Sequence, residues 1–121
     1  MTQRTVFFIS DQTGVTAETL GHSLLTQFSG QNFRQVTLPF IDSEDKALAA
    51  EKKINSAAES DGLRPLVFSS LVHDSLREIV KKADGLYLDI FDAFVHLLEA
   101  ELGVTSSHAT GKAHGMSDIG A

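Results

Sequence analysis

Residues 5–14 read Thr5-Val6-Phe7-Phe8-Ile9-Ser10-Asp11-Gln12-Thr13-Gly14. The first half of this stretch is continuously apolar or β-branched, which is typical of a strand covered on both faces in a parallel sheet. After the polar turn, small or apolar side chains recur at helical spacing, at Ala17, Leu20, Gly21, Leu24 and Phe28. Thr16 is placed to cap the first turn of that helix. The stretch therefore predicts a buried strand followed by an amphipathic helix.

The order of strand and then helix repeats along the chain. Apolar side chains alternate with other residues over 36–40 and predict a second strand, with Pro39 at a sheet edge or strand end. A helix is predicted from Ser43 to just before Gly62, and a third strand over 64–71. A short helix follows and closes at the Asp84-Gly85 turn.

A fourth unit fills the region before Gly103. Apolar residues keep helical spacing up to that glycine, at Tyr87, Phe91, Phe94, Val95, Leu98 and Leu102. Residues 86–88 are equally consistent with a short strand that leads into the helix. We expect Phe91, Phe94 and Leu98 to form a core stripe, unless they cover a partner.

These repeats predict the α/β class, with a parallel sheet of about four strands and helices on both faces. The predicted domain covers residues 1–103. From Val104 the periodicity is lost and small polar residues dominate, so 104–121 is predicted to be a loop or linker.

Composition excludes several function classes. The chain has 121 residues and a net charge of −6, with no block of basic residues, so nucleic acid and anionic membranes are not expected partners. It has no cysteine, and its five histidines lack metal-ligand spacing, so no metal site built from these residues is expected. The N-terminal apolar run is too short for a leader or a membrane span, which predicts a cytoplasmic protein.

The turn after the first strand is the candidate site, with Ser10, Asp11, Thr13, Gly14 and Thr16. Open α/β sheets bind ligands where a strand ends and a helix begins, and backbone N–H groups there favour an anion such as phosphate. A carboxylate at Asp11 would oppose phosphate unless it acts on a hydroxyl proton, orients another group or binds magnesium. The alternative is that these side chains only satisfy the N–H groups of the turn.

The C-terminal segment contributes one further candidate and one failed motif. His114 lies in a predicted loop, where functional groups are common, and is assigned to phosphate or substrate binding. Thr110-Gly111-Lys112 resembles the end of a phosphate-binding P-loop. That motif requires Gly at the position of Ser106 and Ser or Thr at the position of Ala113, so the chain contains no P-loop.

Longer stretches resemble the regulatory proteins of phosphoenolpyruvate synthase and of pyruvate, phosphate dikinase. The resemblance is carried by residues 6–28 and continues through Thr37-Leu38-Pro39-Phe40, Arg64-Pro65-Leu66-Val67-Phe68, Asp89-Ile90-Phe91 and Gly111-Lys112-Ala113-His114-Gly115. It implies a bifunctional enzyme, a threonine kinase that uses ADP and a phosphorylase that removes the phosphate with inorganic phosphate and releases pyrophosphate.

The resemblance also implies what this chain lacks. The family's ADP site is a P-loop in a C-terminal half that lies beyond residue 121, so 104–121 would lead toward that domain and this chain alone is expected to be inactive. Asp11 is the residue to which we assign a catalytic role. The choice between the two target enzymes and the existence of a homodimer are left open. The competing hypothesis is a non-catalytic α/β module that binds a partner protein or a small anion.

Overall fold

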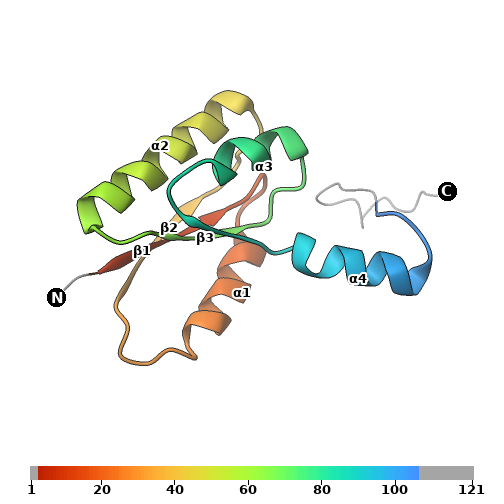
Figure 1. Ribbon diagram of the computed structural model, residues 1–121, viewed down its shortest axis with the longest axis horizontal. Coiled ribbons are helices and arrows are strands. Elements are labelled where there is room, and N and C mark those ends of the chain that lie inside the picture. The colour runs from red at the N-terminus through yellow and green to blue at the C-terminus, as the bar shows by residue number, and fades with distance from the viewer. Residues whose placement is uncertain (1–2, 107–121) are drawn as a thin grey trace.

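Four parallel strands form one sheet in the computed structural model, which describes residues 3–106. The strands are β1 (Arg4–Ile9), β2 (Phe33–Leu38), β3 (Leu66–Ser69) and β4 (Leu86–Asp89). Their order across the sheet is β2-β1-β3-β4, and every neighbouring pair is parallel (Figure 1). The chain therefore leaves β1 toward one edge and then returns across it to β3.

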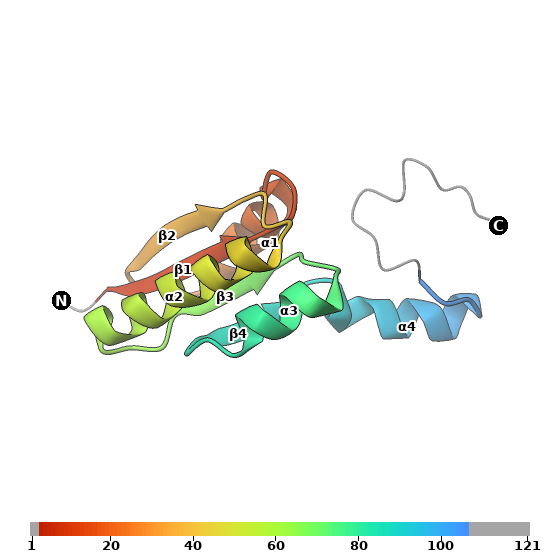
Figure 2. The same ribbon diagram turned by 90° about the horizontal axis from the view of Figure 1, so that it is seen from above.

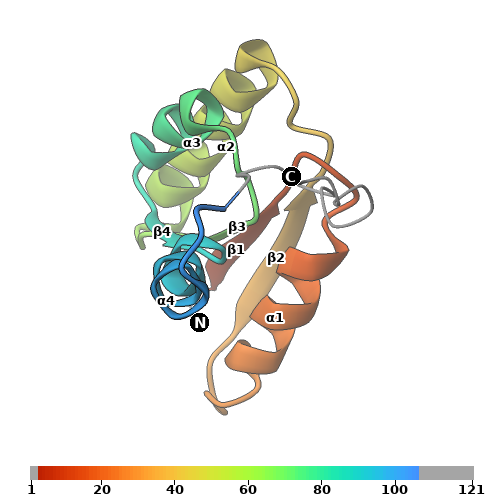
Figure 3. The ribbon, with the colours of Figure 1, turned by 90° about the vertical axis from the view of Figure 1, so that its right-hand side faces the viewer.

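Helices cover both faces of the sheet. The helix α1 (Val15–Leu25) lies on one face, and α2 (Glu44–Asp61) and α3 (Asp74–Lys81) lie together on the other (Figures 1 and 3). The last helix, α4 (Asp92–Leu102), follows β4 and extends away from the sheet (Figure 2). The predicted α/β class, with four parallel strands and helices on both faces, is confirmed.

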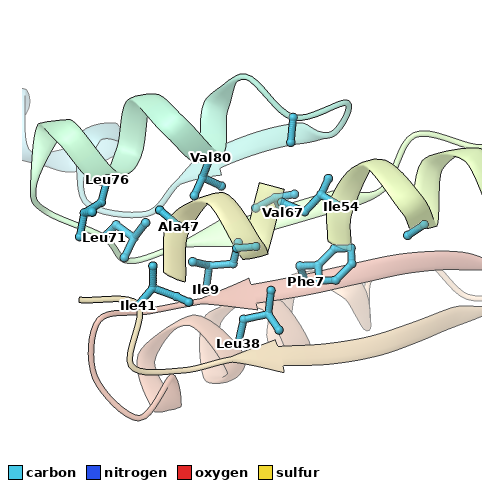
Figure 4. Close-up of a cluster of buried hydrophobic side chains, with 13 residues drawn as sticks. Phe7, Ile9, Leu38, Ile41, Ala47, Ile54, Val67, Leu71, Leu76 and Val80 are labelled. Carbon is cyan, nitrogen blue, oxygen red and sulfur yellow. The ribbon is translucent and has the colours of Figure 1, made fainter. Parts of the chain in front are cut away.

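Two hydrophobic clusters hold these layers together. The larger one packs Phe7 and Ile9 of β1 against Ile54 of α2 and Val80 of α3 (Figure 4). The smaller one places Val6, Phe8 and Phe68 under Ala17 and Leu25 of α1. Because successive strand residues point to opposite faces, β1 supplies both clusters and is buried along its length from Thr5 to Ile9. The buried first strand is confirmed.

The layer formed by α1 approaches the sheet very closely at Gly21. The rings of Phe8 and Phe68 are stacked beneath it, with 5.8 Å between their centroids. A Cβ atom added to Gly21 would lie 2.3 Å from Cε1 of Phe8 and 3.1 Å from Cδ2 of Phe68. Only glycine fits at this position unless the rings move.

Several expected side-chain positions were wrong. Helix α1 ends at Leu25, and Leu25, rather than Leu24 or Phe28, packs on the sheet. The expected core stripe on the last helix is also wrong, since Phe94 is 58% and Leu98 55% exposed. No residue of α4 is buried, because the described part of the chain places no layer against this helix.

The strand bounds differ modestly from expectation. β2 begins at Phe33, before the predicted start, and ends immediately before Pro39 at an edge of the sheet. β3 is shorter than the predicted 64–71. Residues 86–89 are a strand, which confirms the alternative interpretation of the fourth unit. Helix α2 begins after Ser43, whose Oγ accepts a hydrogen bond from the Lys46 N–H.

Within residues 3–106, no helix combines the length and the apolar composition required to span a bilayer.

Candidate functional site

The candidate site lies at the carboxyl edge of the sheet, between the segments that follow β1 and β3. In the sheet, β2 lies on one side of β1 and β3 lies on the other side of β1. The strand order thus reverses at this point, and the crevice outside the strand ends is where open α/β sheets bind ligands. Ile9 is in register with Ser69, so the Ser10–Gly14 turn and the Ser70 segment emerge side by side.

The polar turn is anchored to the segment that follows β2. Ser10 is buried, and its Oγ accepts a hydrogen bond of 2.9 Å from the Gln12 N–H. The carbonyl oxygens of Ser10 and Gln12 accept hydrogen bonds from the Ile41 and Phe40 N–H groups, both at 2.9 Å. Phe40 adopts a φ of 59° to do so. The role of Ser10 is thus largely structural, in agreement with the turn-forming alternative for this residue.

Helix α1 starts at a glycine, and the prediction that Thr16 caps it was wrong. Gly14 is the N-cap, with a φ of 95°, and no side chain within residues 3–106 caps the N-terminal N–H groups of the helix. A Cβ at Gly14 would lie 2.9 Å from Cγ2 of Thr37, so β2 also requires glycine here. Thr16 lies in the first turn as expected, but it is exposed and two residues too late to act as the cap. The first-turn N–H groups remain available to an anion or to water.

Asp11 is the residue of the turn that turn chemistry does not explain. Its side chain is partly exposed, yet its Oδ1 atom is buried and has no hydrogen-bond partner among the described residues. An unpartnered buried carboxylate oxygen is unfavourable for stability and calls for an explanation, such as a bound water or ion or a catalytic role. Thr13 is exposed beside it. The structure therefore brings Asp11, Thr13 and the start of α1 together, whereas His114 lies outside the described residues.

Sequence reasoning missed the serine pair at the end of β3. The Ser70 N–H donates a 2.9 Å hydrogen bond to the carbonyl of Ile9, which ties this loop to the end of β1. The Oγ of Ser69 accepts hydrogen bonds from the Leu71 N–H at 3.2 Å and from the Tyr87 hydroxyl at 2.8 Å. Burial raises the pKa of Tyr87 to about 12. The only signal in the sequence was two adjacent serines closing an apolar run.

A second missed group joins α3, β4 and α4 through Arg77. Its guanidinium forms ion pairs with Asp89 at 2.8 Å, with Asp74 at 3.2 Å and with Asp92 at 3.6 Å. Burial disfavours the charge of Arg77, but the surrounding carboxylates, Asp89 foremost, raise its pKa. Three carboxylates surround the guanidinium and offset its charge, while its buried Nε has no hydrogen-bond partner among the described residues. Helical spacing in the sequence could have linked Asp74 to Arg77, but nothing linked Arg77 to Asp89 and Asp92, because they come from other elements.

The described residues offer few ligands for a magnesium ion. No group of three His, Cys, Asp or Glu side chains that could hold a metal occurs within residues 3–106. Asp11 alone would have to supply the protein ligand. One or two carboxylates together with substrate phosphates and water are an ordinary environment for Mg²⁺, so Asp11 fits that arrangement if a phosphate ligand is present.

The protein is thus an open α/β protein, and its candidate site lies at the carboxyl ends of the strands, where the strand order reverses. The chain belongs to the kinase/pyrophosphorylase family, whose family model matches residues 6–119. It is 56% identical over 115 residues to a protein of Azoarcus sp. (strain BH72), covering 95% of this chain and 42% of that protein. A relative from Marinobacter nauticus is 51% identical, with 98% of this chain and 44% of the relative covered. Both are named "Putative phosphoenolpyruvate synthase regulatory protein".

These relatives are more than twice as long as the stretch that matches this chain. The chain spans less than half of each and corresponds to their N-terminal half. The family match runs through the predicted boundary at residue 103 without interruption, and the division into 1–103 and 104–121 remains a prediction.

Proposed function

We propose that this chain is the N-terminal part of a regulatory enzyme that phosphorylates a threonine of phosphoenolpyruvate synthase, or of pyruvate, phosphate dikinase. ADP is the phosphoryl donor, and inorganic phosphate removes the group again as pyrophosphate. The observation that carries the proposal is the match over 95% of the chain to a relative named for the regulation of phosphoenolpyruvate synthase. The family description as kinase and pyrophosphorylase supports the two opposed reactions. A cytoplasmic location remains the expectation that accompanies this function.

The ADP site is assigned to the part of the protein that this chain does not include. The chain has no Gly-rich loop ending in Gly-Lys-Ser or Gly-Lys-Thr, the motif that would cradle the nucleotide phosphates. ADP, when bound, supplies the phosphoryl group and the negative charge that the site must stabilise. The contribution of the present residues is then the edge around Ser10–Thr16, at which we place the phosphate or the target threonine.

Each candidate residue receives a role that its geometry permits. Asp11, with an unpartnered oxygen, accepts the proton of the target hydroxyl or holds magnesium. The uncapped first turn of α1 after Gly14 donates N–H groups to a phosphate oxygen. Thr13 and Thr16 are exposed and can donate from their hydroxyl groups, and Ser10 shapes the turn. His114 is retained as a proposed phosphate or substrate ligand.

The test compares the full-length protein with the 121-residue chain. Each is incubated with purified phosphoenolpyruvate synthase and ADP, and phosphothreonine is measured by mass spectrometry. Pyrophosphate release is measured in the reverse direction with inorganic phosphate. We expect both activities in the full-length protein and neither in this chain. If the full-length protein binds the target tightly without changing its phosphorylation, the binding-module hypothesis replaces the enzyme.

A substitution in the full-length protein tests the role of Asp11. Asp11→Asn keeps the size of the side chain and should lower both transfer rates by about 100-fold or more, a typical effect of losing a general base. Its stability should be unchanged or slightly higher, because Oδ1 of Asp11 has no hydrogen-bond partner among the described residues. Asp84→Asn is the matched control. Asp84 is exposed in the turn before β4, at the amino ends of the strands and therefore away from the candidate site. Normal rates in Asp11→Asn would reduce the turn to a structural feature.

A further inference from the structure

Helix α4 presents an apolar face that nothing in the described chain covers. Among residues 3–106, eleven large hydrophobic side chains are exposed, and five of them lie between positions 94 and 104. Four of these five belong to α4 and recur at helical spacing, at Phe94, Leu97, Leu98 and Leu102. Monomeric proteins seldom expose a contiguous patch of this kind, and such patches usually mark an interface.

The neighbouring edge of the sheet is open as well. Among the described residues, β4 pairs only with β3, and Leu86 at its start is exposed. A parallel sheet is ordinarily covered on its faces and protected at its edges. Between α1, β4 and the first turn of α4 lies a cavity of about 490 Å³. Its apolar walls include Leu24, Leu88 and Phe94, so the cavity continues the apolar face of α4.

The relatives contain further polypeptide that could cover this surface. The chain corresponds to their N-terminal half and to 42–44% of their length, so about half of each relative follows the matched stretch. Helix α4 is the last element of the described chain, and Figure 2 shows it running on from β4 beyond the end of the sheet. In the relatives, the polypeptide that follows is joined to α4 through the residues that correspond to 103–119 of this chain.

We infer that the α4 face, together with the cavity beside β4, is the docking surface for the C-terminal half of the same polypeptide. The occupant is apolar where it meets Phe94, Leu97 and Leu98, and it completes the hydrophobic layer that the expected core stripe would have formed. The inference concerns packing within one full-length protein and does not depend on the proposed reaction.

Single cysteines report whether this surface is covered. Leu97 and His96 are adjacent on α4 and both are well exposed: Leu97 is 70% exposed as a whole residue, and the side chain of His96 is 71% exposed. The chain has no cysteine of its own. Leu97→Cys and His96→Cys are made in the 121-residue chain and in a cysteine-free full-length protein, and the rate of alkylation is measured over a wide dilution series. His96→Cys is the matched control, because it lies on the polar face of the helix.

The expected result is a difference between the two lengths. Both cysteines should react rapidly in the short chain. In the full-length protein, Leu97→Cys should be slowed about tenfold or more at every dilution, whereas His96→Cys should be slowed far less. Equal rates in the two lengths would overturn the inference. Protection of Leu97→Cys that disappears on dilution, or that grows with concentration in the short chain, would instead identify a second copy as the occupant and would also overturn it.

A polar double variant provides an independent readout. Phe94→Ser with Leu98→Ser should lower the urea midpoint of the full-length protein and leave that of the short chain nearly unchanged, because both side chains are already exposed there. An unchanged midpoint in both lengths would contradict the inference.

Discussion

Replacing Gly21 by alanine tests the close contact between α1 and the sheet. In an ordinary helix interior, Gly→Ala is stabilising by about 1 kcal/mol. Here the new methyl carbon would lie 2.3 Å from Cε1 of Phe8, whereas carbon atoms pack favourably at about 3.5–4.0 Å. Phe8 is 1% exposed and stacked against Phe68, and its ring also meets His22 edge-on at 5.3 Å, so it has little room to move.

The expected magnitude follows from the two opposed effects. Overpacking in a tight core costs about 1–3 kcal/mol, and the severity of this overlap favours the upper end. After the gain in helix propensity is subtracted, Gly21→Ala should lose about 2 kcal/mol of unfolding free energy. The assay is urea unfolding followed by circular dichroism, with an unchanged m value expected. Ser23→Ala on the exposed face of α1 is the control, and it should be neutral or gain about 0.5 kcal/mol.

A double-mutant cycle identifies the cause of the loss. Phe8→Leu removes the ring that the methyl group would strike, so Gly21→Ala should cost clearly less in that background. If Gly21→Ala were instead as stabilising as helix propensity alone implies, the close approach of α1 to the sheet would be refuted.

Two further predictions concern a helix start and a buried hydroxyl. Thr16→Ala should change the unfolding free energy by less than about 0.5 kcal/mol, because Thr16 is not the N-cap of α1. Ser43→Ala should cost about 1 kcal/mol, because Ser43 caps α2. Equal losses for the two variants in urea unfolding would contradict the cap assignment. Tyr87→Phe should cost about 1 kcal/mol at neutral pH through the lost hydrogen bond to Ser69. Burial raises the pKa of Tyr87 from its ordinary value of 10.0 to about 12 in the folded protein. The stability that the protonated hydroxyl contributes is therefore fully present below pH 10 and is lost as the pH rises toward 12. Stability measured over this range should fall less steeply in Tyr87→Phe, and an identical slope in both proteins would argue against a buried hydroxyl.

The elements with a strong local signal were the ones that sequence predicted well. The apolar run at Thr5–Ile9 had no alternation, and it is the central, doubly covered strand. Ser43 and Gly62 marked both ends of α2 through capping chemistry, which depends only on neighbouring residues. Pro39 correctly placed the end of β2 at a sheet edge, because proline cannot donate to a ladder.

The failures occurred where the decision depended on distant contacts. Thr16 was an adequate N-cap by type, but hydrogen bonds from the backbone of Phe40 and Ile41 hold the turn, and Gly14 starts the helix. The periodic side chains of α4 predicted a core stripe, since spacing reveals an apolar face and not what covers it.

The sequence by itself therefore determined the α/β class, the buried first strand, the position of the polar turn at its end and the family to which the chain belongs. These features depend on local patterns or on long identical stretches. Only the tertiary structure decided three further features of residues 3–106. Within that range Asp11 keeps an unpartnered oxygen while Ser10 is used within the turn, and the apolar face of α4 is uncovered. Arg77 forms ion pairs with carboxylates from β4 and α4 as well as from its own helix. Each of these depends on side chains that meet only after separate elements have packed, and hydrophobic spacing along the chain contains no information about which elements become neighbours.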